Sequence, residues 1–107
     1  MVYQNKLLVI RILFQSFQKK PLYGAHRPLA YMEETGNYSS ILRFNIFKKE
    51  VKQGQQIVFE TILESPVGFG EHLREGALLT IKNGLDLIGK AILLEVIGYF
   101  DEIKKGK

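Results

Sequence analysis

Few residues of this chain could take part in catalysis, and their spacing matches no common type of reaction centre. The chain has two histidines and no cysteine, so cysteine nucleophiles, thiolate metal ligands and disulfides are excluded. Glu71, His72 and Glu75 lie close together in the sequence, but zinc or non-haem iron needs at least three well-spaced ligands, and the other histidine, His26, is distant. We interpret the segment around His72 as a charged, solvated loop and predict no metal site.

Motifs for nucleophilic catalysis and for nucleotide binding are also missing. None of the serines lies in a G-x-S-x-G elbow. The stretch GFGEHL, Gly68–Leu73, begins like the dinucleotide fingerprint G-x-G-x-x-G but has leucine at its third glycine position, and no G-x-x-x-x-G-K-[ST] loop occurs. We therefore predict a protein that is not an enzyme and uses no cofactor or nucleotide. An enzyme whose triad assembles only in space is kept as a remote alternative.

The composition is that of one globular domain. With 107 residues, 46% of them hydrophobic and 24% charged, the chain is long enough to bury a single core. The net charge of +4 favours an acidic partner, although a solvated basic surface explains it about as well. The apolar run near the N-terminus is interrupted by Arg11 and is too short to cross a bilayer. Since the lack of cysteine fits a reducing compartment, we predict a cytoplasmic protein without membrane contact.

Six segments alternate between apolar and other residues with the period of two that is typical of β-strands. Turn-forming residues separate them, and Asn83-Gly84 between the last two segments is a strong signal for a β-hairpin. Between the fourth and fifth segments we expect a loop with at most one helical turn. Because no helix is predicted to cover the sheet, the strands must close on themselves into a small antiparallel barrel. The predicted strands are Lys6–Phe14, Arg27–Met32, Asn37–Phe47, Gln55–Leu63, Ala77–Lys82 and Asp86–Ile97.

These segments define one all-β domain over residues 1–100. Residues 101–107 contain three lysines and two acidic residues, and we predict that they form a flexible basic tail. No stretch of the chain has the composition of a linker between domains.

Three groups of short motifs follow one another in a recognisable order. Arg27-Pro28, Tyr31 and Thr35-Gly36 come first, Gly54, Leu63 and Pro66 follow, and Lys82, Gly84 and Ile88-Gly89 come last. Their order and spacing resemble the C-terminal (third) domain of elongation factor Tu and its translational GTPase relatives. The resemblance implies a closed, six-stranded, Greek-key-like barrel. The GTPase and middle domains of that family are absent, and Leu85 and Asp86 replace a glycine and an arginine of its last turn.

In that family the barrel contacts the T-stem backbone of aminoacyl-tRNA and also packs against the GTPase domain and partner proteins. The resemblance implies that phosphate contacts lie in the basic loop before Arg27-Pro28 and at the last hairpin. Arg27 has an alternative role as a rim residue that pairs with an acid. Tyr23 is the one aromatic residue predicted near the basic loop, so the sequence shows no motif for stacking bases. The residues implied to bind nucleic acid are Lys19, Lys20, Arg27, Lys82 and Gly84.

Two functional hypotheses follow from these observations. The first is a non-catalytic, translation-related module that binds tRNA or another structured RNA. The second is a protein-interaction module that docks a translation-related protein or forms a homodimer. For the second hypothesis, Phe69, Leu85 and Leu87 are the apolar residues expected to be exposed.

Overall fold

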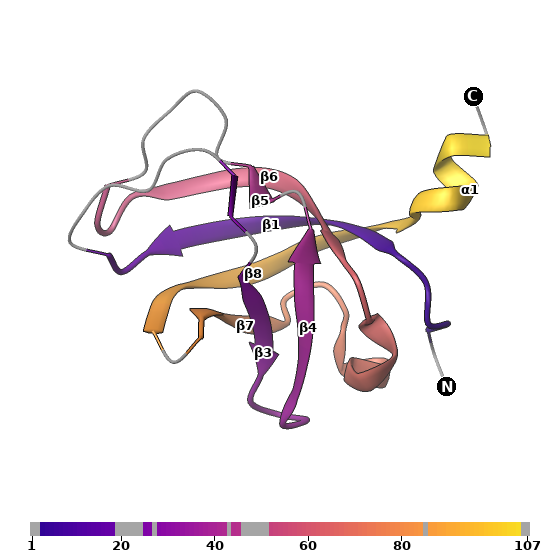
Figure 1. The fold of residues 1–107 in the computed structure, drawn as a ribbon, viewed down its shortest axis with the longest axis horizontal. Coiled ribbons are helices and arrows are strands. Elements are labelled where there is room, and N and C mark those ends of the chain that lie inside the picture. The colour runs from indigo at the N-terminus through magenta and orange to yellow at the C-terminus, as the bar shows by residue number, and fades with distance from the viewer. Residues whose placement is uncertain are drawn as a thin grey trace.

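The protein is a β-barrel with short helical segments at its margins (Figure 1). The computed structural model describes residues 3–18, 25–26, 28–42, 44–45, 52–84 and 86–105. The six strands of the barrel are β1 (Leu8–Ser16), β3 (Leu29–Met32), β4 (Asn37–Leu42), β6 (Gln56–Leu63), β7 (Leu78–Asn83) and β8 (Asp86–Tyr99). The remaining elements are β2 (Ala25–His26) and β5 (Phe44–Asn45), which pair with each other, the 3-10 helix η1 (Pro66–His72) and the helix α1 (Phe100–Lys105).

The barrel strands close in the order β1-β6-β4-β3-β7-β8, and every neighbouring pair is antiparallel. This confirms the predicted all-β class and the closed six-stranded barrel. The consecutive strands β3, β4 and β6 lie side by side, and β1 lies beside β6 rather than beside β3. That arrangement is the strand order of a Greek key.

The described part of the C-terminal segment continues from the last strand of the barrel into a short helix. β8 runs to Tyr99, and α1 follows it directly. Asp101 and Glu102 lie in the first turn of α1, where carboxylates stabilise the positive end of the helix dipole. The amide of Phe100 donates a hydrogen bond to the carbonyl of Leu7, so the start of α1 is attached to the segment that leads into β1.

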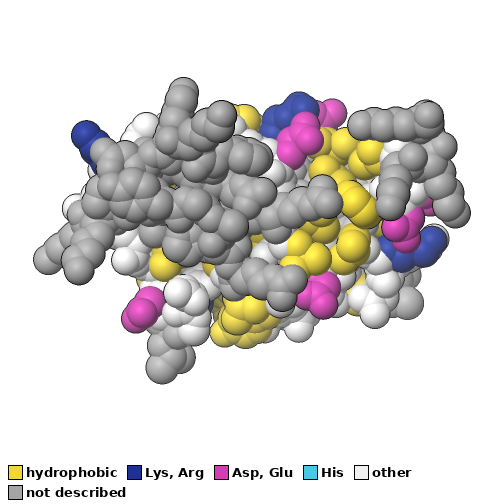
Figure 2. Space-filling view, turned by 45° about the horizontal axis from the view of Figure 1, so that its top comes forward, with side chains coloured by type: hydrophobic (Ala, Val, Ile, Leu, Met, Phe, Trp, Pro, Cys, Tyr) yellow, Lys and Arg dark blue, Asp and Glu magenta, His cyan; other side chains and the backbone are white. Residues whose placement is uncertain are grey.

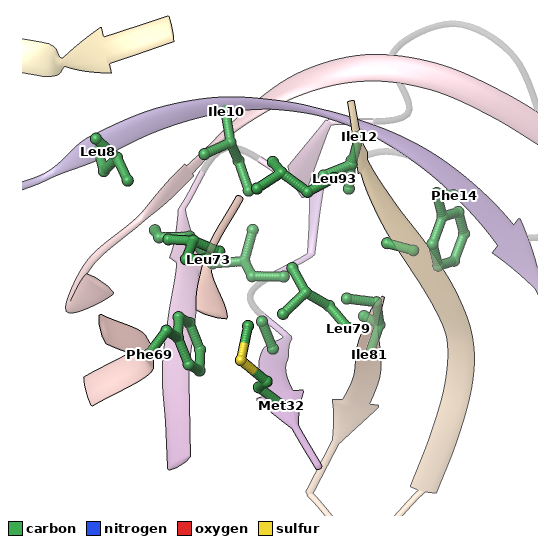
Figure 3. Packing of buried hydrophobic residues seen from close by; sticks show 14 of the residues in the cluster. Leu8, Ile10, Ile12, Phe14, Met32, Phe69, Leu73, Leu79, Ile81 and Leu93 are labelled. Carbon is green, nitrogen blue, oxygen red and sulfur yellow. The ribbon is translucent and has the colours of Figure 1, made fainter. Parts of the chain in front are cut away.

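The core fills the barrel with side chains from alternate positions of the strands. Along β1 every second residue is buried, beginning at Leu8, as a strand with one inward face requires. The helix η1 contributes Phe69 and Leu73 follows it; both are fully buried at one end of the cluster, where Phe69 lies next to Met32 (Figure 3). The prediction of a loop with at most one helical turn between β6 and β7 therefore missed a part of the core.

The N-terminal segment ties down one end of the barrel. The hydroxyl of Tyr3 donates a 2.5 Å hydrogen bond to the carbonyl of Leu73, and the hydroxyl of Tyr99 accepts one of 2.8 Å from the amide of Gln4. Burial raises the pKa of Tyr3 above its usual value, and the neighbouring Tyr99 raises it further. In Figure 1 the described N-terminal segment and α1 lie at the same end of the molecule, away from the β7–β8 hairpin.

Candidate nucleic-acid interface

The β7–β8 hairpin positions Lys82 and Gly84, two of the residues implied to contact nucleic acid. Asn83 pairs with Asp86, so Asn83 belongs to β7 and is not part of the turn that the sequence suggested at Asn83-Gly84. Gly84 has φ of 65°, a left-handed conformation that glycine adopts without steric cost. A residue with positive φ directly after the first strand is typical of the tight turns that join antiparallel strands.

Both flanks of the predicted basic segment are attached to this hairpin. On one side the amide of Phe17 donates a hydrogen bond to the carbonyl of Ile88, and the Nε2 group of Gln18 donates one to the carbonyl of Leu87. On the other side Leu29 pairs with Lys82 across β3 and β7. The sequence between these two anchors contains Lys19, Lys20 and Arg27, which lie outside the described residues, as does Leu85.

A pair of tyrosines lies beside Lys82 on the outer face of the barrel. Tyr31 of β3 pairs directly with Tyr38 of β4, and their ring centroids are 4.7 Å apart with the ring planes inclined by 42°. The Nζ atom of Lys82 lies 4.9 Å from the centroid of the Tyr31 ring, within the range of a cation–π contact. Tyr38 is 51% exposed. We call Tyr31, Tyr38 and Lys82 the tyrosine–lysine cluster.

Tyr31 and Tyr38 were not among the residues predicted to bind nucleic acid. They lie on different strands, and their contact depends on the register of the β3–β4 hairpin, in which Met32 pairs with Asn37. The signal that could have found them is the predicted Thr35-Gly36 turn. Its amides both donate hydrogen bonds to the carbonyl of Met32, and residues placed symmetrically about such a turn face each other.

A further basic side chain lies on the same row of the outer face. Thr80 pairs with Tyr31 on one side and with Lys90 on the other, and Lys90 is exposed. The cross-strand row therefore contains two tyrosines, a threonine and a lysine, with Lys82 diagonal to Tyr31.

Phe69 and Leu87 were both expected to be exposed, and the structure describes both of them. Leu87 is 45% exposed at the start of β8. Phe69 has no exposed surface, so the expectation that it forms a docking surface is wrong. Its ring enters the core because the non-helical Gly70 turns the backbone within η1 and because Leu73 packs in the same cluster.

An acidic hollow of about 530 Å³ lies at the other end of β7. His72 and Glu34 are in contact in its lining, with 3.0 Å between Nδ1 and Oε2. Within the described residues no group of three histidine or acidic side chains has the geometry of a metal site. The hollow adds negative charge at this end of the face. Its lining residues are Glu33, Glu34, His72, Arg74, Glu75, Gly76, Ala77 and Leu78.

Neither a protein-family model nor a curated protein matches this chain. Among the residues that the structure describes, no helix has both the length and the apolar character needed to span a membrane.

Proposed function

We propose that this barrel is a non-catalytic RNA-binding module, related in function to translation, which contacts tRNA or another structured RNA. The observation that carries the proposal is the attachment of both flanks of the basic segment to the hairpin with Lys82. The sequence resemblance to the C-terminal domain of elongation factor Tu supports the same conclusion, because its implied phosphate contacts map to these two segments. The family membership is itself part of the proposal.

The charges of this region suit the phosphate backbone of RNA. Lys82 can extend from β7, and Gly84, two residues further along the chain, has no side chain to separate the hairpin backbone from a phosphate. Lys19, Lys20 and Arg27 lie in the sequence between the two anchored flanks. Such a site releases counterions when it binds RNA, so its affinity falls steeply as the salt concentration rises.

We predict that Lys82→Gln weakens binding to bulk tRNA and lowers the slope of log K against log salt concentration by about 1, because one phosphate contact is lost. Reversal of the charges of Lys19 and Lys20 should weaken binding further and leave the fold intact. The measurement is a fluorescence-anisotropy titration at two salt concentrations.

The matched control for this experiment is Lys6→Gln. Lys6 also lies over a tyrosine ring, with Nζ 5.9 Å from the centroid of Tyr99, but it precedes β1 at the opposite end of β8. Its replacement should leave tRNA affinity unchanged. Absence of any binding by the wild-type protein at low salt would overturn the proposed function.

A second candidate function, self-association, is favoured by a separate surface. Val58, Leu13, Ile92 and Leu78 pair in register across β6, β1, β8 and β7 and form an apolar row. Its two ends, Val58 and Leu78, are 52% and 66% exposed. Figure 2 looks onto the side where β6 and β1 lie and shows hydrophobic side chains gathered next to charged ones.

The occupant that best fits the apolar row is a second copy of this chain. On one side of the row Arg11 bridges Glu60 and Glu95, at 2.9 and 2.5 Å. On the other side lies Lys90. A twofold axis along the row would place Glu95 of each copy opposite Lys90 of the other, so the surface is electrostatically self-complementary.

For this second candidate we expect a mass of twice the 12.3 kDa of one chain in sedimentation equilibrium. Leu78→Ser should convert the dimer to a monomer, because it removes the most exposed apolar side chain of the row. Leu87→Ser is the control, since this exposed leucine lies outside the row. A monomer mass at every concentration, or equal effects of both variants, would exclude this candidate.

A further inference from the structure

We propose that the tyrosine–lysine cluster binds an unpaired segment of RNA, with one base stacked on the ring of Tyr38 and a backbone phosphate of the same segment near Lys82. This inference rests on the proposed RNA-binding function and makes it specific. It assigns the site to single-stranded segments of RNA, such as loops and ends, in addition to the backbone contacts of the hairpin.

The ring of Tyr38 has the properties of a stacking platform. Tyr31 packs against it at 4.7 Å between centroids, and Tyr31 in turn has Lys82 at 4.9 Å from its own centroid. The neighbouring strands β4, β3 and β7 therefore hold Tyr38, Tyr31 and Lys82 next to one another in space. Because Tyr31 restricts the ring of Tyr38 while half of Tyr38 stays exposed, the ring is both ordered and accessible.

The exposed ring of Tyr38 lies on the outer face of the barrel, where a ligand can reach it. Among the residues that the structure describes, Tyr38 is not part of the cluster that fills the inside of the barrel. A base in a duplex is covered on both faces by its neighbours, whereas an unpaired base can stack on an aromatic side chain. The accessible ring therefore selects unpaired nucleotides over helical RNA.

The charges around the tyrosine–lysine cluster determine the direction in which a bound RNA chain can run. Glu33 and Glu34 follow β3 directly and line the acidic hollow together with Glu75. These three carboxylates outnumber the one arginine of the lining, Arg74, and the histidine that contacts Glu34. Phosphates are repelled from that end of the face, while Lys82 and the hairpin attract them at the other end. From Tyr38 the RNA backbone therefore extends past Lys82 toward Gly84.

The test compares a short single-stranded oligouridine carrying one 2-aminopurine with a perfectly paired RNA duplex. We expect wild-type protein to prefer the single strand and to quench the fluorescence of 2-aminopurine, which reports stacking. Tyr38→Leu should weaken single-strand binding about 5- to 150-fold and abolish the quenching. Tyr38→Phe keeps the ring and should behave like the wild type. Thermal unfolding should show that both variants fold, because Tyr38 is exposed.

The outcomes separate this inference from the proposed function. If the wild-type protein binds RNA but Tyr38→Leu keeps full affinity for the single strand, or the duplex binds equally tightly, the stacking site is wrong and the RNA-binding function stands. If Tyr38→Phe loses as much affinity as Tyr38→Leu, the hydroxyl and not the ring makes the contact, and the stacking site is also wrong. If neither RNA binds at low salt, both proposals fail.

Discussion

Phe69→Ala is expected to lower the free energy of unfolding by about 3–5 kcal/mol, the range for removing a buried aromatic ring from a core. Phe69 has no exposed surface and lies between η1 and the barrel, beside Met32 (Figure 3). Its removal would leave a cavity that η1 cannot easily fill, because the hydrogen bond from Tyr3 holds Leu73 in place. Urea unfolding followed by circular dichroism measures the loss.

The control for this variant makes the same chemical change on the surface. Phe17 is 38% exposed at the end of β1, so Phe17→Ala should cost clearly less. Domains of this size are stable by only about 5–15 kcal/mol, and Phe69→Ala can therefore leave little folded protein at room temperature. Phe69→Leu then provides a milder variant. A loss no larger than that of Phe17→Ala would show that Phe69 is not part of the core.

Gly89→Ala should destabilise the barrel by about 3 kcal/mol, the upper part of the usual range for an overpacked core. A methyl group at this position would clash with the backbone oxygen of Gln15 and would lie 2.5 Å from the Cε1 atom of Phe14. Both contacts are far inside van der Waals distance. Gly89 pairs with Ser16 of β1 and Ile81 of β7, so any relief must move one of these strands. The same urea titration measures the effect.

A double-mutant cycle shows which neighbour causes the strain. Phe14→Leu removes the ring atoms that face Gly89 but leaves the oxygen of Gln15 in place. We therefore expect the double variant to recover only part of the loss. Wild-type stability of Gly89→Ala, within about 0.5 kcal/mol, would contradict the close packing of β8 against β1.

The period of two predicted most of the barrel, because each strand has one face in the core and one outside. β6 begins one residue later than predicted, and β3 begins at Leu29 rather than Arg27. Closure could be inferred from the lack of predicted helices. The burial of Phe69 could not, because a single helical turn has no periodicity that distinguishes an inward residue from an outward one.

Contacts between strands were harder to predict than the strands themselves. The pairing of Tyr31 with Tyr38 and the pairing of Asn83 with Asp86 both depend on the register of the strands. The hydrophobic pattern specifies which face of a strand is buried but not which residues lie opposite each other. Lys82 was found from the motif order, but its neighbour Tyr31 was noted only as part of a motif. The contacts of the candidate site therefore follow from the pairing of the strands and not from any motif in the sequence.

The position of β1 between β6 and β8 determines when the protein can fold during its synthesis. Leu8 pairs with Tyr99, so the last ladder joins residues from nearly opposite ends of the chain. Until β8 has left the ribosomal exit tunnel, β1 lacks one of its two neighbours and presents an unpaired edge. Vectorial folding of this domain can therefore reach only an open sheet, and the closed barrel forms after translation of residue 99.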